Sequence, residues 1–524
     1  MSEFSRHGDM PAGSGLFAPS RRAFLMGGVA AGLAIAAASG SARAQTPKKG
    51  GDLRVAMLGG GPTDTLDPHM IVSSADNARC TAMFEPLTRP DRNAITTNWL
   101  AEEITPNDTA TAWTIRLRPG IKFHDGKAVT SKDVLFSFQR IADPKSPKVG
   151  AARLKIVDFA SARLLDDRTL ELPLTSPCSI LNEFVADPLF AIVPEGFDPG
   201  KPIGTGPFKF KSFTAGQESV FDRNEFYWQD GLPYLNSLTI IDSFASDTAA
   251  FNALLGGQID VLADAPLALV NQITEGGPIK ALISEPGIWT PFTMRVDQPP
   301  FNDVRVRQAF RLLVDREQMV KIAFSGHAVP GNDLFGFWDP CLDKSLVRVR
   351  DVDQAKSLLK QAGQENLTVE LVTSDIAPGV VQSAQVFARQ AQAAGVTVNV
   401  RQVTSDIFFG EQYLSWPFAQ DFWYANPYLA QVGNSGLVDS PFNETHWHDE
   451  RTAGLYKEAL GTVDKDKRCD IIRQMQRIDF DEGGYIIPTY NKSIDLMTSN
   501  VEGFLPGRNG RALGGFGFTE AWMS

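Results

Sequence analysis

The sequence predicts a multidomain α/β protein, and three observations lead to this fold class. The chain has 524 residues, several times the length of a typical single domain. Apolar residues make up 43% of the chain and charged residues 21%, which is the balance of a folded, water-soluble protein. Strand and helix patterns alternate along the chain and include parallel βαβ units in at least two separate places.

The first βαβ unit follows from a short apolar run and a helix with clear ends. Residues 238–242 and 259–262 read as strands. Between them, Ser246 or Asp247 can cap a helix that ends near Leu255, before two glycines. This order implies a parallel pairing of the two strands through a right-handed crossover.

The second βαβ unit lies further along the chain. Apolar residues alternate over residues 367–371 and again over 396–400, as in strands. Residues 381–394 between them predict a helix that stops at Gly395. Other elements are predicted by caps and alternation: a strand over 112–117 closed by a Pro119-Gly120 turn, a helix opened by the capping-box spacing Thr130 to Asp133, a helix opened by Asn302-Asp303, a helix from Asp315 to Gly326, and a helix over 353–362.

The first 44 residues are predicted to be an export signal. Arg21 and Arg22 precede an apolar stretch over residues 24–38, which is too short to span a bilayer comfortably, and cleavage is expected after Ala44. The paired arginines resemble a Tat signal, and an ordinary Sec signal with an incidental arginine pair is the alternative. Because no cysteine precedes Cys80, we expect a soluble periplasmic protein without a lipid anchor.

Charge and cysteine content exclude several classes of protein. The formal net charge is −11, and the chain has no basic runs, which argues against a nucleic-acid partner. The four cysteines are Cys80, Cys178, Cys341 and Cys469, and their spacing leaves disulfides and buried free thiols equally open.

Catalytic and metal-binding motifs are not found in the sequence. The histidine-containing stretch 446–449 is expected to be a surface loop, and His124 to be a hydrogen-bonded turn residue with an acid/base role as the alternative. Aromatic residues crowd into the stretches 226–228, 335–338 and 408–428, and some of them are expected to line a small-molecule cavity. We therefore expect no enzyme, cofactor or metal.

A series of short sequence motifs, called phrases below, resembles the extracellular solute-binding proteins of family 5, the peptide/nickel-type receptors of ABC importers. The motifs occur in the same order as in that family. The resemblance covers the whole mature chain, and the phrases that carry it are Leu66–His69, Phe84–Thr88, Trp113–Gly126 continuing to Arg140, Gly204–Phe208, Arg223–Trp228 and Pro299–Ala309.

The resemblance implies a two-lobe periplasmic-binding-protein (flytrap) fold with three domains, of the cluster C type. The implied division is a signal peptide over 1–44, domain I over 45–90, 201–285 and 491–524, domain II over 91–200, and domain III over 286–490. It also implies a ligand held between the lobes and delivered to a membrane permease and its ATPase, and we expect a monomer. A sensory co-receptor and a Tat-exported, cofactor-dependent enzyme are the competing readings.

The resemblance also suggests ligand-binding residues. Peptide-binding relatives carry an aspartate three residues after a tryptophan, and here the matching pair is Trp423 and Asn426, with Gln420 where some relatives have arginine. An amide cannot neutralise a buried ammonium group. A neutral, polyhydroxylated, anionic opine-like or modified-peptide ligand is therefore expected, unless Asp421 or another acid takes over the pairing. The predicted ligand-binding residues are Val72, Ser74, Gln420, Asp421, Phe422, Trp423, Tyr424 and Asn426.

Overall fold

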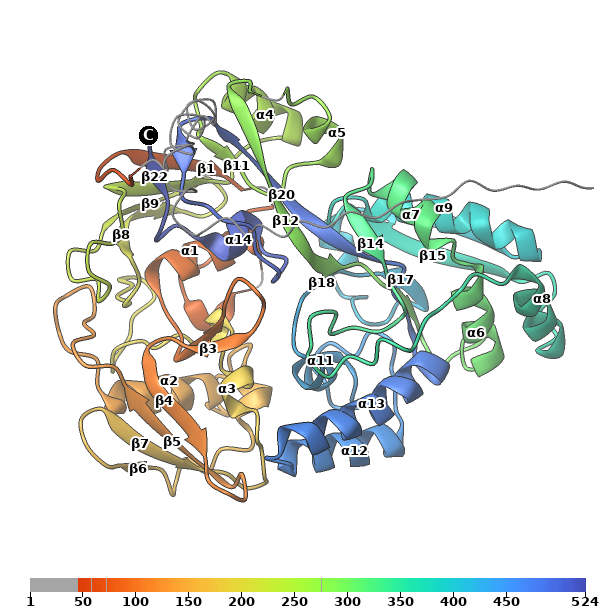
Figure 1. The fold of residues 1–524 in the computed structure, drawn as a ribbon, viewed down its shortest axis with the longest axis horizontal. Coiled ribbons are helices and arrows are strands. Elements are labelled where there is room, and N and C mark those ends of the chain that lie inside the picture. Colours follow the sequence, from red (N-terminus) through yellow and green to blue (C-terminus); the bar gives the residue numbers. More distant parts are fainter. Residues whose placement is uncertain (1–45, 58, 72, 275) are drawn as a thin grey trace, which may run out of the picture. The chain divides into compact units, whose positions relative to one another are not determined.

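Strand pairing in the computed structural model divides the chain among one long sheet and several smaller ones (Figure 1). The structure describes residues 46–524 apart from residues 58, 72 and 275. The predicted export signal, including its paired arginines, lies outside the described residues. Pro47–Ser524 forms one compact unit.

The first sheet has nine strands within the described residues, in the order β18-β12-β20-β11-β1-β10-β9-β8, with β14 also paired to β20. Its parallel centre is formed by β10 and β11, which both pair with β1. The strands are β1 Asp52–Ala56, β8 Phe208–Thr214, β9 Glu218–Arg223, β10 Ser237–Ile241, β11 Val261–Leu262, β12 Ile279–Trp289, β14 Ala328–Pro330, β18 Trp423–Tyr424 and β20 Thr489–Thr498.

The second sheet has the order β16-β15-β17-β13-β19. Its core is largely aromatic: Phe292 and Phe418 lie on neighbouring strands and pack against Phe387 of α9. The strands are β13 Phe292–Met294, β15 Thr368–Ser374, β16 Thr397–Val403, β17 Phe418–Gln420 and β19 Tyr485–Ile486.

The third sheet is antiparallel and has the order β4-β5-β7-β6. Two short ribbons, β2-β3 and β21-β22, complete the strand pairing of the described residues. These strands are β2 Thr88–Pro90, β3 Thr96–Asn98, β4 Ala101–Pro106, β5 Ala112–Leu117, β6 Arg163–Leu164, β7 Thr169–Pro173, β21 Val501–Glu502 and β22 Trp522–Met523.

The helices pack around these sheets, with α7, α8 and α9 beside the second sheet and α12 and α13 forming an adjacent pair (Figure 1). Within the described residues, no helix combines the length and apolarity required to cross a membrane. The helices are α1 Ser74–Met83, α2 Ser131–Ala142, α3 Leu181–Phe184, α4 Asp247–Leu255, α5 Leu267–Val270, α6 Val304–Leu313, α7 Arg316–Ala323, α8 Val352–Gln361, α9 Val380–Ala391, α10 Ser405–Phe408, α11 Tyr428–Ser435, α12 Glu450–Gly461, α13 Lys465–Glu482 and α14 Ala512–Phe516.

Helix caps explain why many of these elements begin and end where they do. A capping box starts α2, in which the Asp133 carboxylate accepts from the Thr130 backbone N–H at 2.8 Å; the same carboxylate also accepts from the Thr130 hydroxyl at 2.7 Å. The Ser246 hydroxyl accepts from the third residue of α4. Gly395 adopts φ +80° after the last turn following α9, a conformation that favours glycine.

The two predicted βαβ units differ in their pairing. β15 and β16 are direct parallel neighbours, as predicted. β10 and β11 are parallel too, but the prediction that they pair directly is wrong, because β1 lies between them. β1 belongs to the start of the chain, so the local pattern around α4 could not reveal that it is inserted there.

Several of the family-like phrases meet at one buried carboxylate, Glu85. It accepts hydrogen bonds from Trp99 Nε1 at 2.8 Å, Thr205 Oγ1 at 2.9 Å, Tyr227 OH at 2.9 Å and Trp228 Nε1 at 3.2 Å. Burial raises the pKa of the Glu85 carboxyl, and these donors oppose that rise. The phrases thus hold the scaffold together at this point.

His124 links two further phrases. Its Nδ1 accepts from the Gly204 N–H at 3.2 Å, and its Nε2 lies 3.1 Å from the Gly206 carbonyl oxygen. Burial lowers the pKa of the imidazole to about 4, so it stays neutral at ordinary pH. This geometry matches the prediction of a hydrogen-bonded turn residue. A Cβ on Gly206 would lie 2.5 Å from the backbone of Met83, so the approach of the two chains requires glycine.

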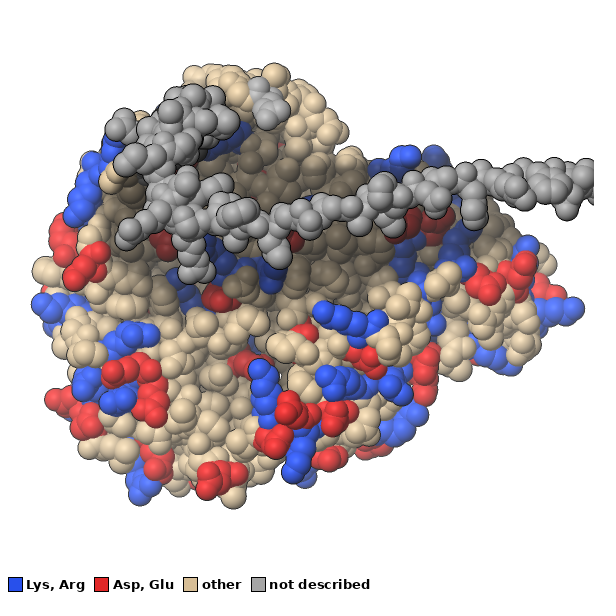
Figure 2. All heavy atoms as spheres, in the orientation of Figure 1, with Lys and Arg blue, Asp and Glu red and all other residues tan. Residues whose placement is uncertain are grey.

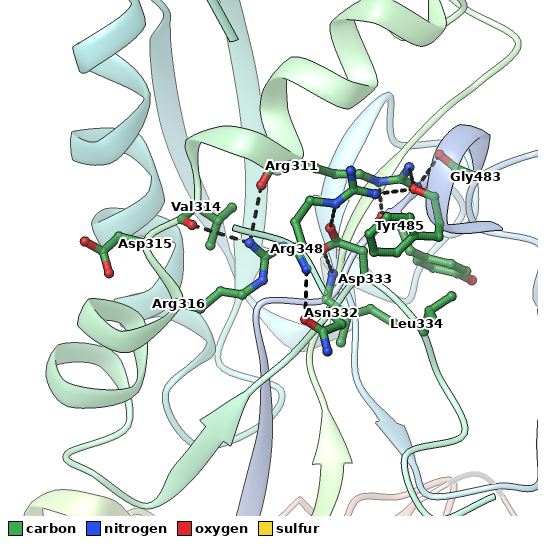
Figure 3. A network of polar contacts seen from close by, with 12 residues as sticks. Arg311, Val314, Asp315, Arg316, Asn332, Asp333, Leu334, Arg348, Gly483 and Tyr485 are labelled. Atoms are coloured by element: carbon green, nitrogen blue, oxygen red, sulfur yellow. Dashed lines mark hydrogen bonds and ion pairs between the residues drawn. The ribbon is translucent and has the colours of Figure 1, made fainter. Parts of the chain in front are cut away.

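A buried arginine network stabilises the region between α6, α7 and the second sheet (Figure 3). Asp333 accepts from Arg316 at 2.7 Å, from Arg348 at 3.1 Å and from the Ile487 backbone N–H at 3.0 Å. Arg311 is fully buried and donates to the backbone carbonyl of Tyr485 at 2.9 Å and to three other carbonyls. Burial lowers the pKa of Arg311 to about 9.

The four cysteines divide into one disulfide and two buried free thiols. Cys341 and Cys469 are bonded across a sequence separation of 128 residues, which ties the segment before α8 to α13. Cys80 and Cys178 are free and buried. Both alternatives that the sequence left open therefore occur.

Candidate functional site

Three short crossings connect the first and second sheets. β12 continues into β13 through Thr290-Pro291, β17 into β18 through Asp421-Phe422, and β19 into β20 through Ile487-Pro488. The Asp421 N–H donates to the Pro291 carbonyl at 3.3 Å, so two of the crossings are directly bonded. Five of the predicted ligand-binding residues lie on or beside the crossing between β17 and β18.

Gln420, at the end of β17, is held inside the second sheet. Its amide nitrogen donates to the Ser383 hydroxyl at 2.7 Å, and its amide oxygen accepts from the Thr373 hydroxyl at 2.8 Å. The side chain is fully buried. Its polar atoms are therefore engaged by α9 and β15.

Asp421 and Trp423 belong to a second buried cluster. The Asp421 carboxylate accepts from Tyr413 OH at 3.1 Å, and Trp423 Nε1 donates to Glu444 at 2.8 Å. Burial raises the pKa of Asp421 to about 6 and raises that of Glu444 well above its usual range, the latter increased further by the Asp421 charge. Asp421 is only 4% exposed. Its carboxylate thus faces protein groups.

Tyr424, Ser74 and Phe422 lie on the other side of the crossing. Burial raises the pKa of Tyr424 to about 12, the Asp264 charge raises it further, and the Ser74 hydroxyl opposes this rise. The rings of Phe422 and Tyr424 meet edge to face with centroids 5.8 Å apart. Ser74 is the first residue of α1. The structure places its side chain near Tyr424. Val72 lies outside the described residues.

Two adjoining pockets lie beyond this crossing, and because they share part of their lining we describe them together as one cavity with two chambers. The larger chamber has a volume of about 220 Å³ and the smaller one about 40 Å³. Six residues line both chambers and so form their junction: Ala94, Thr96, Glu183, Ala425, Asn426 and Pro427. Of the predicted ligand-binding residues, Asn426 lies at the junction and Tyr424 lines the smaller chamber.

Charged residues that the sequence did not single out line both chambers. Arg153, Asp187 and Arg511 line the smaller chamber. The larger chamber is lined by Asp339, Lys465 and Arg468, with Trp338 and Cys341 beside them. These side chains come from segments more than 300 residues apart, so no local pattern could have grouped them. The aromatic stretches did point to two lining residues, Trp338 and Tyr424.

Apart from Glu183 at the junction, the smaller chamber is lined by two guanidinium groups and one carboxylate. Arg511 lies 3.5 Å from Asp187 and 5.5 Å from the centre of the Tyr424 ring. Arg153 donates to the neutral amide oxygen of Asn434, at 3.0 and 3.3 Å. Burial lowers the pKa of Arg153, the Asp187 charge opposes this, and the Arg511 charge adds to it. Away from the junction, where Glu183 lies, cations thus outnumber carboxylates in the lining of this chamber.

Within the described residues, no group of three histidine, cysteine, aspartate or glutamate side chains could hold a metal ion. His446 lies 2.9 Å from the Leu414 carbonyl oxygen, and His448 lies 3.2 Å from Glu450. The two histidines of the 446–449 stretch therefore contact different parts of the chain.

Comparisons with known proteins agree with this architecture. A family model described as "Bacterial extracellular solute-binding proteins, family 5 Middle" matches residues 96–441. The periplasmic oligopeptide-binding protein OppA of Escherichia coli K12 is 24% identical over 476 residues, which cover 82% of this chain and 86% of OppA. The glutathione-binding protein GsiB of Pectobacterium atrosepticum is 28% identical over 478 residues, which cover 86% of this chain and 91% of GsiB.

A solved structure shows the same fold. The periplasmic binding protein AgaA of A. tumefaciens R10, in complex with agropinic acid, superposes with a TM-score of 0.78 at 23% identity, covering 90% of this chain and 99% of AgaA. This likeness confirms the fold class predicted from the phrases. Because the family model covers well over half of the sequence, the chain belongs to the family 5 bacterial extracellular solute-binding proteins.

Proposed function

We propose that this protein is the periplasmic substrate-binding component of an ABC importer and that it captures a small polar solute in the two-chambered cavity. Its relatives by sequence include binding proteins for oligopeptides and for glutathione. The observation that carries the proposal is the cavity itself. Residues 94–96 and 180–187 line one side of it, and residues 338–341, 425–430 and 465–472 line the other.

The two sides of the cavity are built by different segments of the chain. A capture mechanism requires such an arrangement. A ligand that contacts both sides binds the closed state, in which the two sides meet, more tightly than the open state. This difference in affinity shifts the equilibrium toward the closed state. The permease can then recognise the ligand-bound form. Binding and release suffice for this role, without any covalent change in the solute. We also propose the three-domain division given above and a monomeric state.

The size of the cavity supports a small ligand. Clefts that hold drug-sized molecules are about 300–1,000 Å³, whereas the larger chamber is about 220 Å³. An extended oligopeptide is larger than either chamber.

The ligand is proposed not to be a standard peptide recognised through its free α-ammonium group. Asn426, which stands in the position of the relatives' aspartate, faces the cavity and donates to Gln431 at 2.9 Å. Asp421, the alternative partner for an ammonium group, is engaged by Tyr413 and by the Phe422 N–H. It is not among the residues that line either chamber.

Two experiments test the proposal. Mass spectrometry of the purified protein should detect a bound small solute, and calorimetry should show that this solute rebinds with 1:1 stoichiometry. Free-amine di- and tripeptides should bind at least tenfold more weakly than that solute. Tight binding of a free-amine peptide that is lost in Asp421→Asn would overturn the exclusion of standard peptides. Absence of any binding solute, together with measurable turnover of a metabolite, would overturn the receptor function.

A further inference from the structure

The sign of the lining charges changes along the cavity. Basic side chains predominate in the two chambers, and an acidic side chain lies at the junction between them. Arg153 and Arg511 face the smaller chamber with Asp187 as the one carboxylate confined to it. Glu183 and Asn426 are shared by both chambers and therefore lie where the two meet. The order of charge along the cavity can thus be read from its lining.

Away from the junction, cations outnumber carboxylates in the larger chamber as they do in the smaller one. Lys465 and Arg468 line it together with Asp339. The Asp339 carboxylate is already engaged, because it accepts from the Tyr428 and Cys341 backbone N–H groups, both at 2.7 Å. Arg468 donates to neutral acceptors, among them the Ser179 hydroxyl at 3.2 Å. Apart from Glu183 at the junction, this chamber is therefore also lined by two cations and one carboxylate.

Glu183 at the junction differs from the other acids of the cavity. Among the described residues, no hydrogen bond or ion pair to its carboxylate occurs. Burial, together with the Asp339 charge, raises the pKa of Glu183 to about 7 against the opposing charges of Arg468 and Lys465. The group faces the cavity without a protein partner, so a ligand cation placed there would complete its environment.

We propose that the ligand is an elongated dicarboxylate with a protonated nitrogen between its two acidic groups. One carboxylate lies with Arg153 and Arg511, the other with Lys465 and Arg468, and the nitrogen opposes Glu183. The sign of charge along such a ligand is the reverse of that along the cavity, which is the condition for electrostatic complementarity. This inference rests on the proposed function, because it assumes that the cavity is the solute-binding site.

Three matched probes test the proposal by calorimetry. The first is 3,3′-iminodipropionate, which has two carboxylates and a central secondary ammonium group. The second is pimelate, in which a methylene group replaces the nitrogen. The third is N-propyl-β-alanine, which keeps the nitrogen and loses one carboxylate. We expect iminodipropionate to bind at least tenfold more tightly than either of the other two, because pimelate leaves Glu183 without a cation and N-propyl-β-alanine leaves one pair of cations without a carboxylate.

Variants assign the recognition to Glu183. Glu183→Gln should weaken iminodipropionate binding about tenfold or more and leave pimelate binding unchanged or stronger. The matched control is Glu195→Gln, since Glu195 is exposed and does not line the cavity; it should leave all three affinities unchanged. Thermal unfolding of both variants shows whether they remain folded.

The outcomes separate this inference from the function on which it rests. Equal binding of iminodipropionate and pimelate, or an unchanged preference in Glu183→Gln, overturns the inference. It is also overturned if none of the probes binds while the co-purified solute does and lacks two acidic groups flanking a nitrogen. In these cases the receptor function stands. If no solute of any kind binds, the proposed function itself fails.

Discussion

Replacing Asp333 with asparagine should destabilise the fold strongly, because Asp333 is the carboxylate between two buried arginines. It accepts from Arg316 at 2.7 Å and from Arg348 at 3.1 Å, and its side chain is fully buried (Figure 3). Asparagine would place an amide N–H₂ against one of these guanidinium groups and leave both charges unneutralised. Removing one partner of a buried ion pair costs about 3–5 kcal/mol. We expect a fall of that size in the free energy of unfolding.

Urea denaturation followed by tryptophan fluorescence and by circular dichroism measures this loss. The free energies are compared where the two probes coincide, since a chain of several domains need not unfold in one step. Asp470→Asn is the matched control, because Asp470 pairs with Arg473 at 2.9 Å on an exposed helix face, where an ion pair contributes less than about 1 kcal/mol. A loss below about 1 kcal/mol in Asp333→Asn, at an unchanged denaturant slope, would refute the reasoning.

Three further predictions concern backbone packing, the disulfide and pH. Gly206→Ala should lower the free energy of unfolding by about 1–3 kcal/mol, because the added β-carbon would lie 2.5 Å from a backbone atom. Gly61→Ala is the control and should be nearly neutral, because its β-carbon would meet nothing within 4 Å. Equal melting temperatures for the two variants would contradict this prediction. The double variant Cys341→Ser/Cys469→Ser should lose about 2–4 kcal/mol of unfolding free energy, because the disulfide closes a loop of 128 residues. A reductant should lower the melting temperature of the native protein and not that of the variant. Titration of the unfolded, unreduced native protein should find two thiols. Burial raises the pKa of Asp495 to about 8 from its usual 3.8, so the folded state holds this proton more tightly than the unfolded state. The free energy of unfolding should therefore fall as pH rises from about 4 to 8, by up to about 1.4 kcal/mol per pH unit from this group, and Asp495→Asn should flatten the profile; an identical slope in the variant would show that other groups control it.

Local elements were predictable where a cap and a periodic pattern agree. The capping box at Thr130 and Asp133 and the alternation over residues 112–117 both identify elements that the structure contains. The direct pairing of β10 with β11 was not predictable, since strand order in a sheet depends on a strand from the start of the chain. The pairing of Cys341 with Cys469 also depends on tertiary packing and not on spacing.

The phrases that identify the family reveal little about the ligand, and the structure gives a physical reason. Glu85, Thr205, Tyr227 and His124 all belong to such phrases, and their polar atoms bond to one another or to the backbone of the scaffold. Glu183 lies outside the phrases. The cations of the cavity come from helix starts and loops that only the fold brings together, so the residues that would choose a solute carry no signal in the sequence.

Figure 2 shows that acidic and basic side chains are interspersed over the face that carries the third sheet, α12 and α13. The charged groups that line the cavity interact more strongly than the exposed groups of this face, because burial lowers the dielectric around them.

The three crossings between the first and second sheets do not have equal freedom. Two of them contain proline, Pro291 and Pro488, whose ring locks the φ angle. All three crossings join the same two sheets, so a rotation of one sheet against the other would change the backbone dihedrals in each of them, and Asp421-Phe422 is the crossing without a proline-locked φ angle. Asp421 is anchored by Tyr413 on one side of this dipeptide, and Phe422 packs on Tyr424 on the other. Both residues of the dipeptide are therefore held by side-chain contacts, which any such rotation would also have to change.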